Sequence, residues 1–373
     1  MKKTGYIIFS ALILMFVCAI TVCADTNSDY NDAYSVIEEE KLEEFLDKTN
    51  SSYFEDNGID IKDVNWIDKV SVSSFFAEVV RVVKNEAAKP VRVFFSFTAI
   101  ILVCAAFTGN EAKIGLNKTV SLVAVSVVSL IVFNDVWGLV TLLVTTVKNL
   151  CDVISVFIPV FEAALFMSGK VTASAASSGM LIMMTDGLGL AANNYVLPIM
   201  GAYLGIGTVA SVTPFVFIKQ LGEALKKASV ILLSAVFSVF VGITGMQTLV
   251  NSSADNLTVK TSKFIIGTFI PIGGGALGEA ANTVYSSMSL VKSSVGVYGV
   301  VSIAIICLPV IILAVMFKIV FLLSNVIARS FSQNELSNLI SVVDSFLSVV
   351  LSVVLFFAAV FVFSIALIWC LSN

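Results

Sequence analysis

The chain has 373 residues, of which 58% are hydrophobic and 13% charged, and its mean hydropathy is +0.98. Soluble domains average roughly 45–50% apolar and about 25% charged residues, so this composition excludes an ordinary soluble globular protein and indicates a membrane protein. Histidine is absent, which excludes histidine acid–base catalysis, Ser–His or Cys–His nucleophile pairs and histidine metal sites. The sequence holds no cluster of positive charge that would indicate a nucleic-acid partner.

The N-terminal part has the features of an export signal followed by an acidic segment. Lys2 and Lys3 precede an apolar run from Tyr6 to Val22, and small residues follow, which predicts a signal peptide over residues 1–24. An uncleaved first membrane helix is the alternative, since about 17 apolar residues can just span a bilayer. Residues 25–89 hold 16 of the 26 acidic and 7 of the 22 basic side chains. In either case we expect this acidic segment to lie outside the cytoplasm.

The acidic segment is expected to be mainly helical. Its clearest pattern is an apolar stripe with members at i, i+3, i+4, i+7, i+8 and i+11: Val72, Phe75, Phe76, Val79, Val80 and Val83. This spacing predicts an amphipathic helix that ends before Pro90. A segment this short buries too little surface for a robust core of its own. The stripe therefore needs a partner, which is a neighbouring helix at 37–46, the membrane surface or another protein.

Residues 90–373 are predicted to form an all-α, polytopic transmembrane helical bundle. Seven apolar stretches are expected to be membrane spans: Val91–Thr108, Thr119–Phe133, Val153–Ser168, Val196–Phe217, Ala228–Val250, Val295–Ser324 and Ile340–Leu371. Two Gly-, Ser- and Ala-rich stretches, 171–195 and 264–291, carry few charges and are expected to be short or re-entrant helices. The expected number of spans is therefore seven to nine.

The membrane domain contains an internal repeat at an offset of about 112 residues. Phe157-Ile158-Pro159-Val160 reappears as Phe269-Ile270-Pro271-Ile272, and Leu197-Pro198-Ile199 recurs one residue out of step as Leu308-Pro309-Val310. We place the first copy at about 116–217 and the second at about 228–324, before a C-terminal span at 340–371. Proline disrupts a helix, and broken helices in corresponding positions of two repeats indicate a substrate or ion path near the bilayer midplane. Parallel and inverted repeats both fit the sequence.

Ionisable and helix-breaking residues within apolar spans are candidates for function, because such groups are costly in lipid. The candidate conduction or broken-helix positions are Pro159, Glu162, Asp186, Pro271, Gly273, Gly274, Gly275 and Glu279. The carboxylates among them would exchange protons or bind a cation. The alternative is that they mark span ends in water or hydrogen-bond neighbouring helices. Scans for a P-loop, a dinucleotide-binding loop, a Cys-x-x-Cys pair or a nucleophile–base pair fail, so we expect no enzyme activity, metal or cofactor.

Several longer motifs resemble the stage III sporulation protein AE family of endospore-forming Firmicutes. They are Ser211-Val212-Thr213-Pro214-Phe215, Gly242-Ile243-Thr244-Gly245-Met246-Gln247-Thr248, Lys260-Thr261-Ser262-Lys263-Phe264 and the segment from Thr268 to Ala280. The resemblance is strongest over about residues 90–373. It implies a multi-pass protein of the mother-cell membrane that surrounds the forespore. It also implies that the chain acts with other stage III A sporulation proteins and with stage II sporulation protein Q in a channel or secretion-like complex.

Three functions follow from these observations. The first is a channel-forming subunit of such a complex, which supports late forespore gene expression and forms its path from the Pro-containing spans. The second is a membrane scaffold, in which the 72–83 stripe recruits partners and nothing passes through the chain. The third is a stand-alone secondary transporter. The lipid bilayer is the one partner common to all three, and a homo-oligomer is compatible with each.

Overall fold

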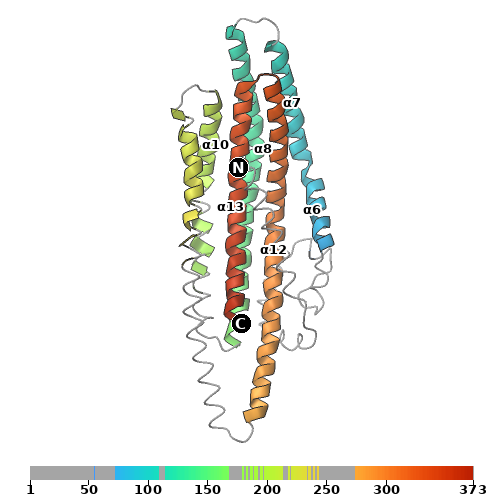
Figure 1. Ribbon diagram of the computed structural model, residues 1–373, viewed down its shortest axis with the longest axis vertical. Coiled ribbons are helices and arrows are strands. Elements are labelled where there is room, and N and C mark those ends of the chain that lie inside the picture. Colours follow the sequence, from blue (N-terminus) through green and yellow to red (C-terminus); the bar gives the residue numbers. More distant parts are fainter. Residues whose placement is uncertain are drawn as a thin grey trace.

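The computed structural model describes residues 72–108, 114–167, 197–212 and 274–372, together with Phe54 and shorter stretches between 179 and 242. The elements are α6 (Val72–Glu86), α7 (Ala88–Thr108), α8 (Ile114–Met167), α10 (Leu197–Val212), α12 (Gly274–Ser330) and α13 (Asn334–Ser372) (Figure 1). No strand occurs in this part of the chain. The all-helical fold class is therefore confirmed, while the signal peptide at 1–24 lies outside the described residues.

Four of the described helices are long and apolar enough to cross a bilayer. Their apolar segments are Ala88–Phe107, Thr119–Pro159, Tyr298–Ser330 and Asn334–Val362, and the apolar helix Pro198–Ser211 is shorter. This supports a membrane protein, with fewer separate spans among these residues than the seven to nine predicted. The stretches predicted at Ala228–Val250 and 171–195 fall largely outside the described residues.

The predicted spans Thr119–Phe133 and Val153–Ser168 are not separate helices, because both belong to α8. No residue between the two predicted spans ends the helix, which continues from one to the other. A stripe of buried residues instead continues through the interval at helical spacing: Val132, Val136, Leu139, Leu143, Val147, Leu150 and Ile154. At 1.5 Å per residue the 54 residues of α8 extend about 80 Å, well beyond the roughly 30 Å hydrocarbon core. The stretch 264–291 was predicted to be a short or re-entrant helix. Its residues 274–291 instead form the first part of the long helix α12.

Two of the repeated prolines lie inside helices that continue past them. Pro159 is within α8 and Pro309 within α12, so the predicted helix break is absent at both. A proline removes one backbone hydrogen bond, but its buried neighbours Ile158 and Val310 keep the adjoining turns packed. Pro198 is instead in the first turn of α10, where a missing N–H costs no helical hydrogen bond. Pro271 and much of the second repeat lie outside the described residues, and the repeat itself stays a prediction.

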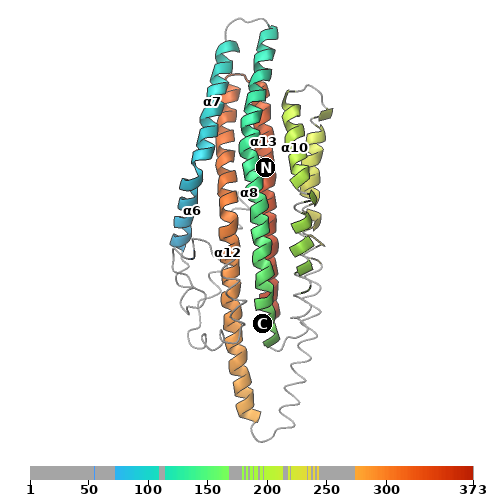
Figure 2. The same cartoon turned by 180° about the vertical axis from the view of Figure 1, so that it is seen from behind.

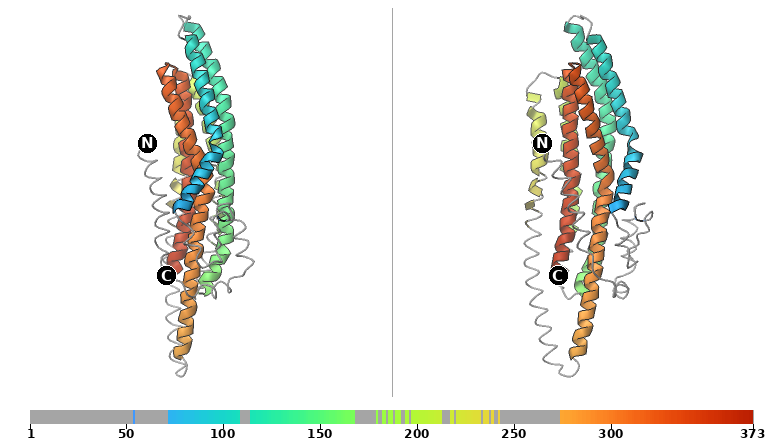
Figure 3. Two further views of the ribbon diagram at one scale, coloured as in Figure 1. Left: turned by 90° about the vertical axis from the view of Figure 1, so that its right-hand side faces the viewer. Right: turned by 45° about the vertical axis from the view of Figure 1, so that its right-hand side comes forward.

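The bundle is built around the antiparallel hairpin of α12 and α13. Helix α8 lies behind both, α7 runs beside α8 and α12, and α10 packs against α13 (Figures 1 and 2). Figure 3 shows that the α7–α8 hairpin extends beyond the α12–α13 turn at one end, whereas α12 extends beyond α13 at the other. The most enclosed helices are therefore α12 and α13.

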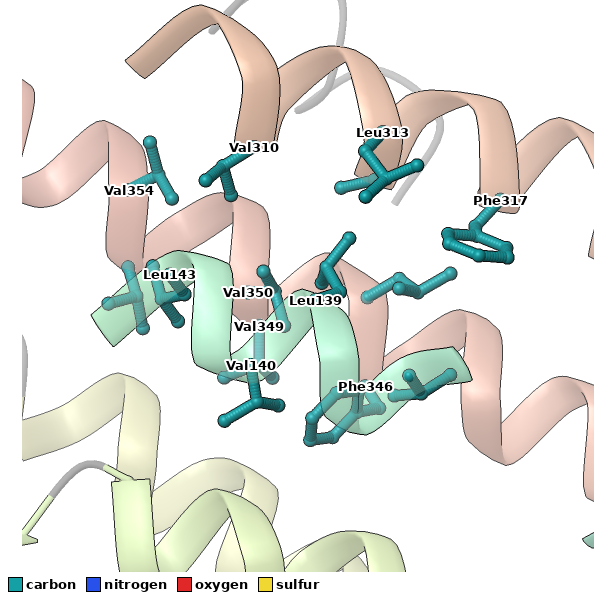
Figure 4. Packing of buried hydrophobic residues seen from close by; sticks show 14 of the residues in the cluster. Leu139, Val140, Leu143, Val310, Leu313, Phe317, Phe346, Val349, Val350 and Val354 are labelled. Carbon is teal, nitrogen blue, oxygen red and sulfur yellow. The ribbon is translucent and has the colours of Figure 1, made fainter. Parts of the chain in front are cut away.

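The core lies where α8, α12 and α13 meet. Ten of its side chains face one another there: Leu139, Val140 and Leu143 of α8, Val310, Leu313 and Phe317 of α12, and Phe346, Val349, Val350 and Val354 of α13 (Figure 4). Lipid tails are as apolar as these side chains, so shape-complementary packing rather than escape from water holds membrane helices together. This core fixes α12 against α13 and so positions the polar groups described below.

A kink separates α6 from α7 at Ala87. Pro90 has no N–H to donate to the Glu86 carbonyl, and its ring crowds that carbonyl, so the helix ends at Glu86 and restarts at Ala88. The Ala87 N–H still bonds to the Val83 carbonyl at 2.9 Å and the Val91 N–H to the Ala87 carbonyl at 3.2 Å, so helical hydrogen bonds connect α6 and α7 across the kink. The predicted end of the amphipathic helix before Pro90 is confirmed.

The α12–α13 turn is a Schellman cap with a serine in the usual glycine position. The Gln333 N–H bonds to the Ala328 carbonyl (2.9 Å) and the Ser332 N–H to the Arg329 carbonyl (3.0 Å). Ser332 has a φ of 57°, a left-handed conformation that is unfavourable for residues with a Cβ. We expect Ser332→Gly to stabilise the protein by about 0.5–1 kcal/mol and Ser332→Val to destabilise it. Thermal unfolding in detergent checks both, and a lower Tm for the glycine variant would contradict this account.

Helix α10 approaches α13 closely at Gly207. A Cβ built on Gly207 would overlap a γ-methyl group of Val342. Gly207→Ala is therefore expected to push α10 away from α13 and destabilise the protein by about 1–3 kcal/mol, as overpacking does. Val342→Ala removes the obstructing methyl, so the double variant is expected to regain most of the loss in thermal unfolding. Equal losses in the single and double variants would show that this contact is not the cause.

Candidate functional site

The first repeated Phe-Ile-Pro element faces protein. Phe157 and Ile158 of α8 are 1% and 2% exposed, and Pro159 is half-buried. Phe157 lies against Gly299 of α12, where an added Cβ would come within 3.1 Å of the ring. The absence of a side chain at Gly299 thus lets α12 approach α8. Glu162 follows one turn later in α8, but its side chain is outside the described residues.

The structure does not bring Glu162 and Glu279 together. Gly274, Gly275 and Glu279 are at the beginning of α12, whereas Pro271 and Gly273 lie outside the described residues. Helices α8 and α12 run in opposite directions and meet at Phe157 and Gly299. Along the bundle, Glu162 is about 8 Å and Glu279 about 30 Å from this level, toward the same end. Their backbones are thus separated by roughly 20 Å along the axis.

Asp186 lies apart from these residues. It is exposed, and its neighbour Thr185 is buried with its carbonyl oxygen 3.8 Å from the Cys151 sulfur of α8. No group of three or more Cys, Asp or Glu side chains that could hold a metal is found in the described part of the chain. Asp186 therefore forms no recognisable cluster with the other predicted positions that the structure places.

The strongest polar cluster joins α12 to α13. The Lys318 ammonium donates to Asp344 Oδ1 at 2.8 Å, to the Asp344 carbonyl oxygen at 3.2 Å and to Ser348 Oγ at 2.7 Å. All three ammonium protons are thereby used. The Ser348 hydroxyl in turn donates to the Asp344 carbonyl at 3.0 Å. The two charged side chains stay 29% and 42% exposed, so this ion pair lies at the surface of the hairpin rather than in its core.

A second set of hydrogen bonds continues this cluster toward the turn. Ser337 Oγ donates to Asn325 Oδ1 at 2.7 Å, Asn325 Nδ2 donates to Ser341 Oγ at 3.3 Å, and Arg329 Nε donates to Ser337 Oγ at 3.1 Å. Together the two sets make a polar seam, which consists of Lys318, Asn325 and Arg329 on α12 and Ser337, Ser341, Asp344 and Ser348 on α13. The seam thus consists of two sets of interhelical hydrogen bonds, one next to the turn and one at the ion pair.

Along the helix axes, the ion pair lies far from the turn, in the middle of the apolar segments. Lys318 is twelve residues before the end of α12 and Asp344 ten residues after the start of α13. Both are therefore about 15–18 Å from the turn, or about half of a 30 Å hydrocarbon core. Ionisable groups at such depth are rare, and they pair with one another or face water. This placement makes the pair the best functional candidate in the described part of the chain.

The rule that ionisable residues within apolar spans are functional candidates could have singled out both residues from the sequence. Lys318 interrupts the apolar stretch Val295–Ser324 and Asp344 interrupts Ile340–Leu371, as Glu162 interrupts its own. The serines of α13 at 337, 341, 345, 348 and 352 recur at helical spacing, which indicates one polar face. The repeat drew attention to proline and glutamate positions instead. The partnership of Lys318 with Asp344 needed the register of the hairpin.

The amphipathic stripe of α6 is only partly covered. Helix α6 packs on α12, with Phe75 packed against the core and Glu78 buried and paired with Arg81 at 2.8 Å. Phe76 and Val80 remain 62% and 49% exposed. The covered face of α6 is thus rotated away from the centre of the stripe, and Phe76 and Val80 stay available to lipid or to a partner.

Comparison with known proteins decides the family. The sequence model described as stage III sporulation protein AE matches residues 61–372, which is most of the chain. The chain belongs to the stage III sporulation protein AE family. A relative, the stage III sporulation protein AE of Bacillus subtilis (strain 168), is 27% identical over 188 residues. That match covers 49% of this chain and 47% of the relative, so the chain spans about half the length of this curated protein. No solved structure matches.

Family membership confirms the resemblance read from the motifs and implies a role in sporulation. The match begins at residue 61, so it includes α6 with its partly exposed stripe as well as the membrane helices. It also includes the whole polar seam. The chain is thus a sporulation-family protein with helices apolar and long enough to cross a membrane, two of which carry the polar seam.

Proposed function

We propose that this chain is a non-enzymatic, multi-pass subunit of a channel or secretion-like complex that links mother cell and forespore and supports late forespore gene expression. The observation that carries the proposal is the polar seam with the half-exposed Lys318–Asp344 pair inside apolar helices. A purely anchoring bundle gains nothing from charges at this depth, whereas a subunit that borders a hydrophilic path needs them. The sporulation family supplies the biological setting.

The proposed location is the mother-cell membrane that surrounds the forespore, with residues 25–89 outside the cytoplasm. The proposed partners are the other stage III A sporulation proteins and, from the forespore side, stage II sporulation protein Q. The exposed part of the α6 stripe supports a partner on this side, because Phe76 and Val80 would otherwise face water or lipid headgroups.

A membrane scaffold is the second candidate function, and the α6 stripe is the observation that favours it. In that case Phe76 and Val80 recruit partners, and the seam only holds α12 against α13. A stand-alone secondary transporter is a further alternative, for which flux through the purified chain without partners would be the supporting result.

The test is complementation in a sporulating strain that lacks its own copy of the protein. Lys318→Gln with Asp344→Asn removes both charges and keeps hydrogen-bonding groups of similar size. We expect normal protein levels in the membrane but a fall of about tenfold or more in late forespore gene expression, because the charges themselves are required. Glu162→Gln with Glu279→Gln forms a second arm that tests the carboxylates selected by the repeat.

The matched control is Glu86→Gln with Lys89→Gln, which neutralises an exposed ion pair of 2.9 Å at the α6–α7 junction. It is expected to sporulate normally, since exposed pairs contribute little. Normal sporulation from the Lys318/Asp344 variant would reject a conducting role for the seam. Loss of partner capture by Phe76→Asp with Val80→Asp, together with that result, would establish the scaffold instead.

A further inference from the structure

The outward face of α13 is polar along the half that adjoins the turn. Its partly exposed residues include Ser341, Asp344, Ser345, Ser348 and Ser352, which we call the α13 polar strip. Ser341, Ser345, Ser348 and Ser352 follow one another at intervals of three or four residues, and Asp344 lies four residues before Ser348, so the five share one side of the helix. The strip itself spans about 17 Å, and its far end at Ser352 lies about 27 Å from the start of α13, nearly the depth of a hydrocarbon core.

The neighbouring helix has the opposite character where it is exposed. Apart from Arg329 and Ser330 next to the turn, the exposed side chains of α12 over the same length are apolar: Val315, Ile319, Leu322, Leu323 and Val326. Lipid is the natural environment for that surface. The α13 polar strip has the same depth in the bundle but carries hydroxyls and a carboxylate, so its natural environment is different.

The strip is hydrogen-bonded to neighbouring helices but keeps acceptor oxygens partly exposed. Ser341, Ser348 and Ser352 each donate to a carbonyl four residues earlier, at 2.8–3.0 Å. The Ser341 and Ser348 oxygens also accept from Asn325 and Lys318 of α12, yet all three serines stay partly exposed, and a hydroxyl oxygen can accept a second hydrogen bond, here from water. Asp344 keeps 42% of its side chain exposed although Lys318 is bonded to it. At the edge toward α10, the Tyr203 hydroxyl lies 3.5 Å from the Val342 carbonyl and hydrogen-bonds Ser345. Beyond Ser352 the partly exposed residues of α13 are apolar, among them Leu355, Phe356 and Val362.

We propose that the α13 polar strip is the wall of a water-filled passage that opens at the α12–α13 turn and reaches Ser352. The passage admits water and small hydrophilic solutes. Lys318 and Asp344 compensate each other, so the middle of the wall carries no net charge and selects neither anions nor cations. The proposal rests on the proposed function, because the passage is that of the assembled complex, and it assigns the surface that borders it.

The experiment is cysteine accessibility in the full chain within native membranes. The six native cysteines are replaced by alanine or serine in a version that still supports sporulation. Ser345→Cys and Ser352→Cys report on the strip, and Ile319→Cys and Leu322→Cys are matched controls on the exposed apolar face of α12. A charged, membrane-impermeant methanethiosulfonate reagent is added to membrane vesicles of both orientations. The strip cysteines are expected to react at least about tenfold faster, because only a thiol in contact with water ionises to the reactive thiolate.

Equal and slow labelling of all four positions would overturn the proposal. Oxidative cross-linking of Ser345→Cys to a second copy of the chain would also overturn it, since the strip would then be a packed interface. The readout is independent of sporulation. Fast labelling combined with normal sporulation of the Lys318/Asp344 variant would reject the proposed function and leave the water-facing wall intact. Slow labelling combined with lost sporulation of the Lys318/Asp344 variant would reject the water-facing wall and support the proposed function.

Discussion

Asp344→Leu alone is expected to deplete the folded protein in the membrane by more than about tenfold. The substitution leaves the Lys318 ammonium without its carboxylate partner about 15 Å from the helix ends. The Lys318 side chain is only 29% exposed, so the charge left behind is mostly enclosed by the helices even where water reaches the α13 polar strip. An unpaired lysine at the centre of a membrane helix costs roughly 2.5–3.5 kcal/mol, and each 1.4 kcal/mol corresponds to about a factor of ten. Quantitative immunoblots of membrane fractions, with folded protein identified by its resistance to added protease, measure the effect.

The double variant Lys318→Met with Asp344→Leu separates stability from function. Replacing both partners of an ion pair by apolar side chains of similar length is often neutral or stabilising. We therefore expect protein levels to return close to those of the wild type, while late forespore gene expression stays low. If the double variant is as depleted as the single one, the pair stabilises the hairpin in its own right. If it restores gene expression, the seam is only structural.

Phe346→Ala is expected to destabilise the bundle by about 3–5 kcal/mol. Phe346 is 0% exposed, and its ring stacks on Tyr203 of α10 with centroids 6.4 Å apart and planes at 12°. Its removal leaves a cavity beside α8 and withdraws the main aromatic contact between α10 and α13. This cost arises from lost packing rather than from transfer out of water, so it persists in lipid or detergent. Thermal unfolding of the purified protein in detergent provides the measurement.

Phe95→Ala is the matched control, because it deletes the same group from a side chain of α7 that is 66% exposed. We expect a change within about 0.5 kcal/mol for this variant. Similar losses for the two variants would mean that the side chain of Phe346 is not enclosed as described. Phe346→Leu, which keeps more of the volume, is expected to fall between them.

Much of the fold could be predicted from apolar patterning, and the errors of that prediction have a common origin. The apolar runs at Val91–Thr108, Val295–Ser324 and Ile340–Leu371 all correspond to long helices. The division of α8 into two spans was wrong, although polar residues such as Asp135 and Lys148 lie between the two apolar runs. Asp135 is half-buried and Lys148 exposed, while the buried stripe of α8 continues between the two runs through Leu139 and Leu143. Local hydropathy averages over both sides and cannot register that continuity.

The site was harder to predict than the fold. The repeat directed attention to Pro159 and Glu162, whereas the strongest polar contact involves Lys318 and Asp344, which have no counterpart in the repeat register. Each of these two residues is visible in the sequence as an isolated charge within an apolar run. That they neutralise each other depends on a turn of three residues and on the cap at Ser332, which set the register between α12 and α13.

The sequence by itself determined that this is a helical membrane protein of a sporulation family, because composition, helical periodicity and family motifs are properties of the linear chain. It also determined that α6 must end near Pro90, since the missing N–H acts locally. Only the tertiary structure decided which charges meet, which part of the α6 stripe is covered, and that α13 presents hydroxyls outward while α12 presents apolar side chains. These features depend on helix rotation and register, which are set by packing among Leu139, Phe317 and Phe346 on three separate helices.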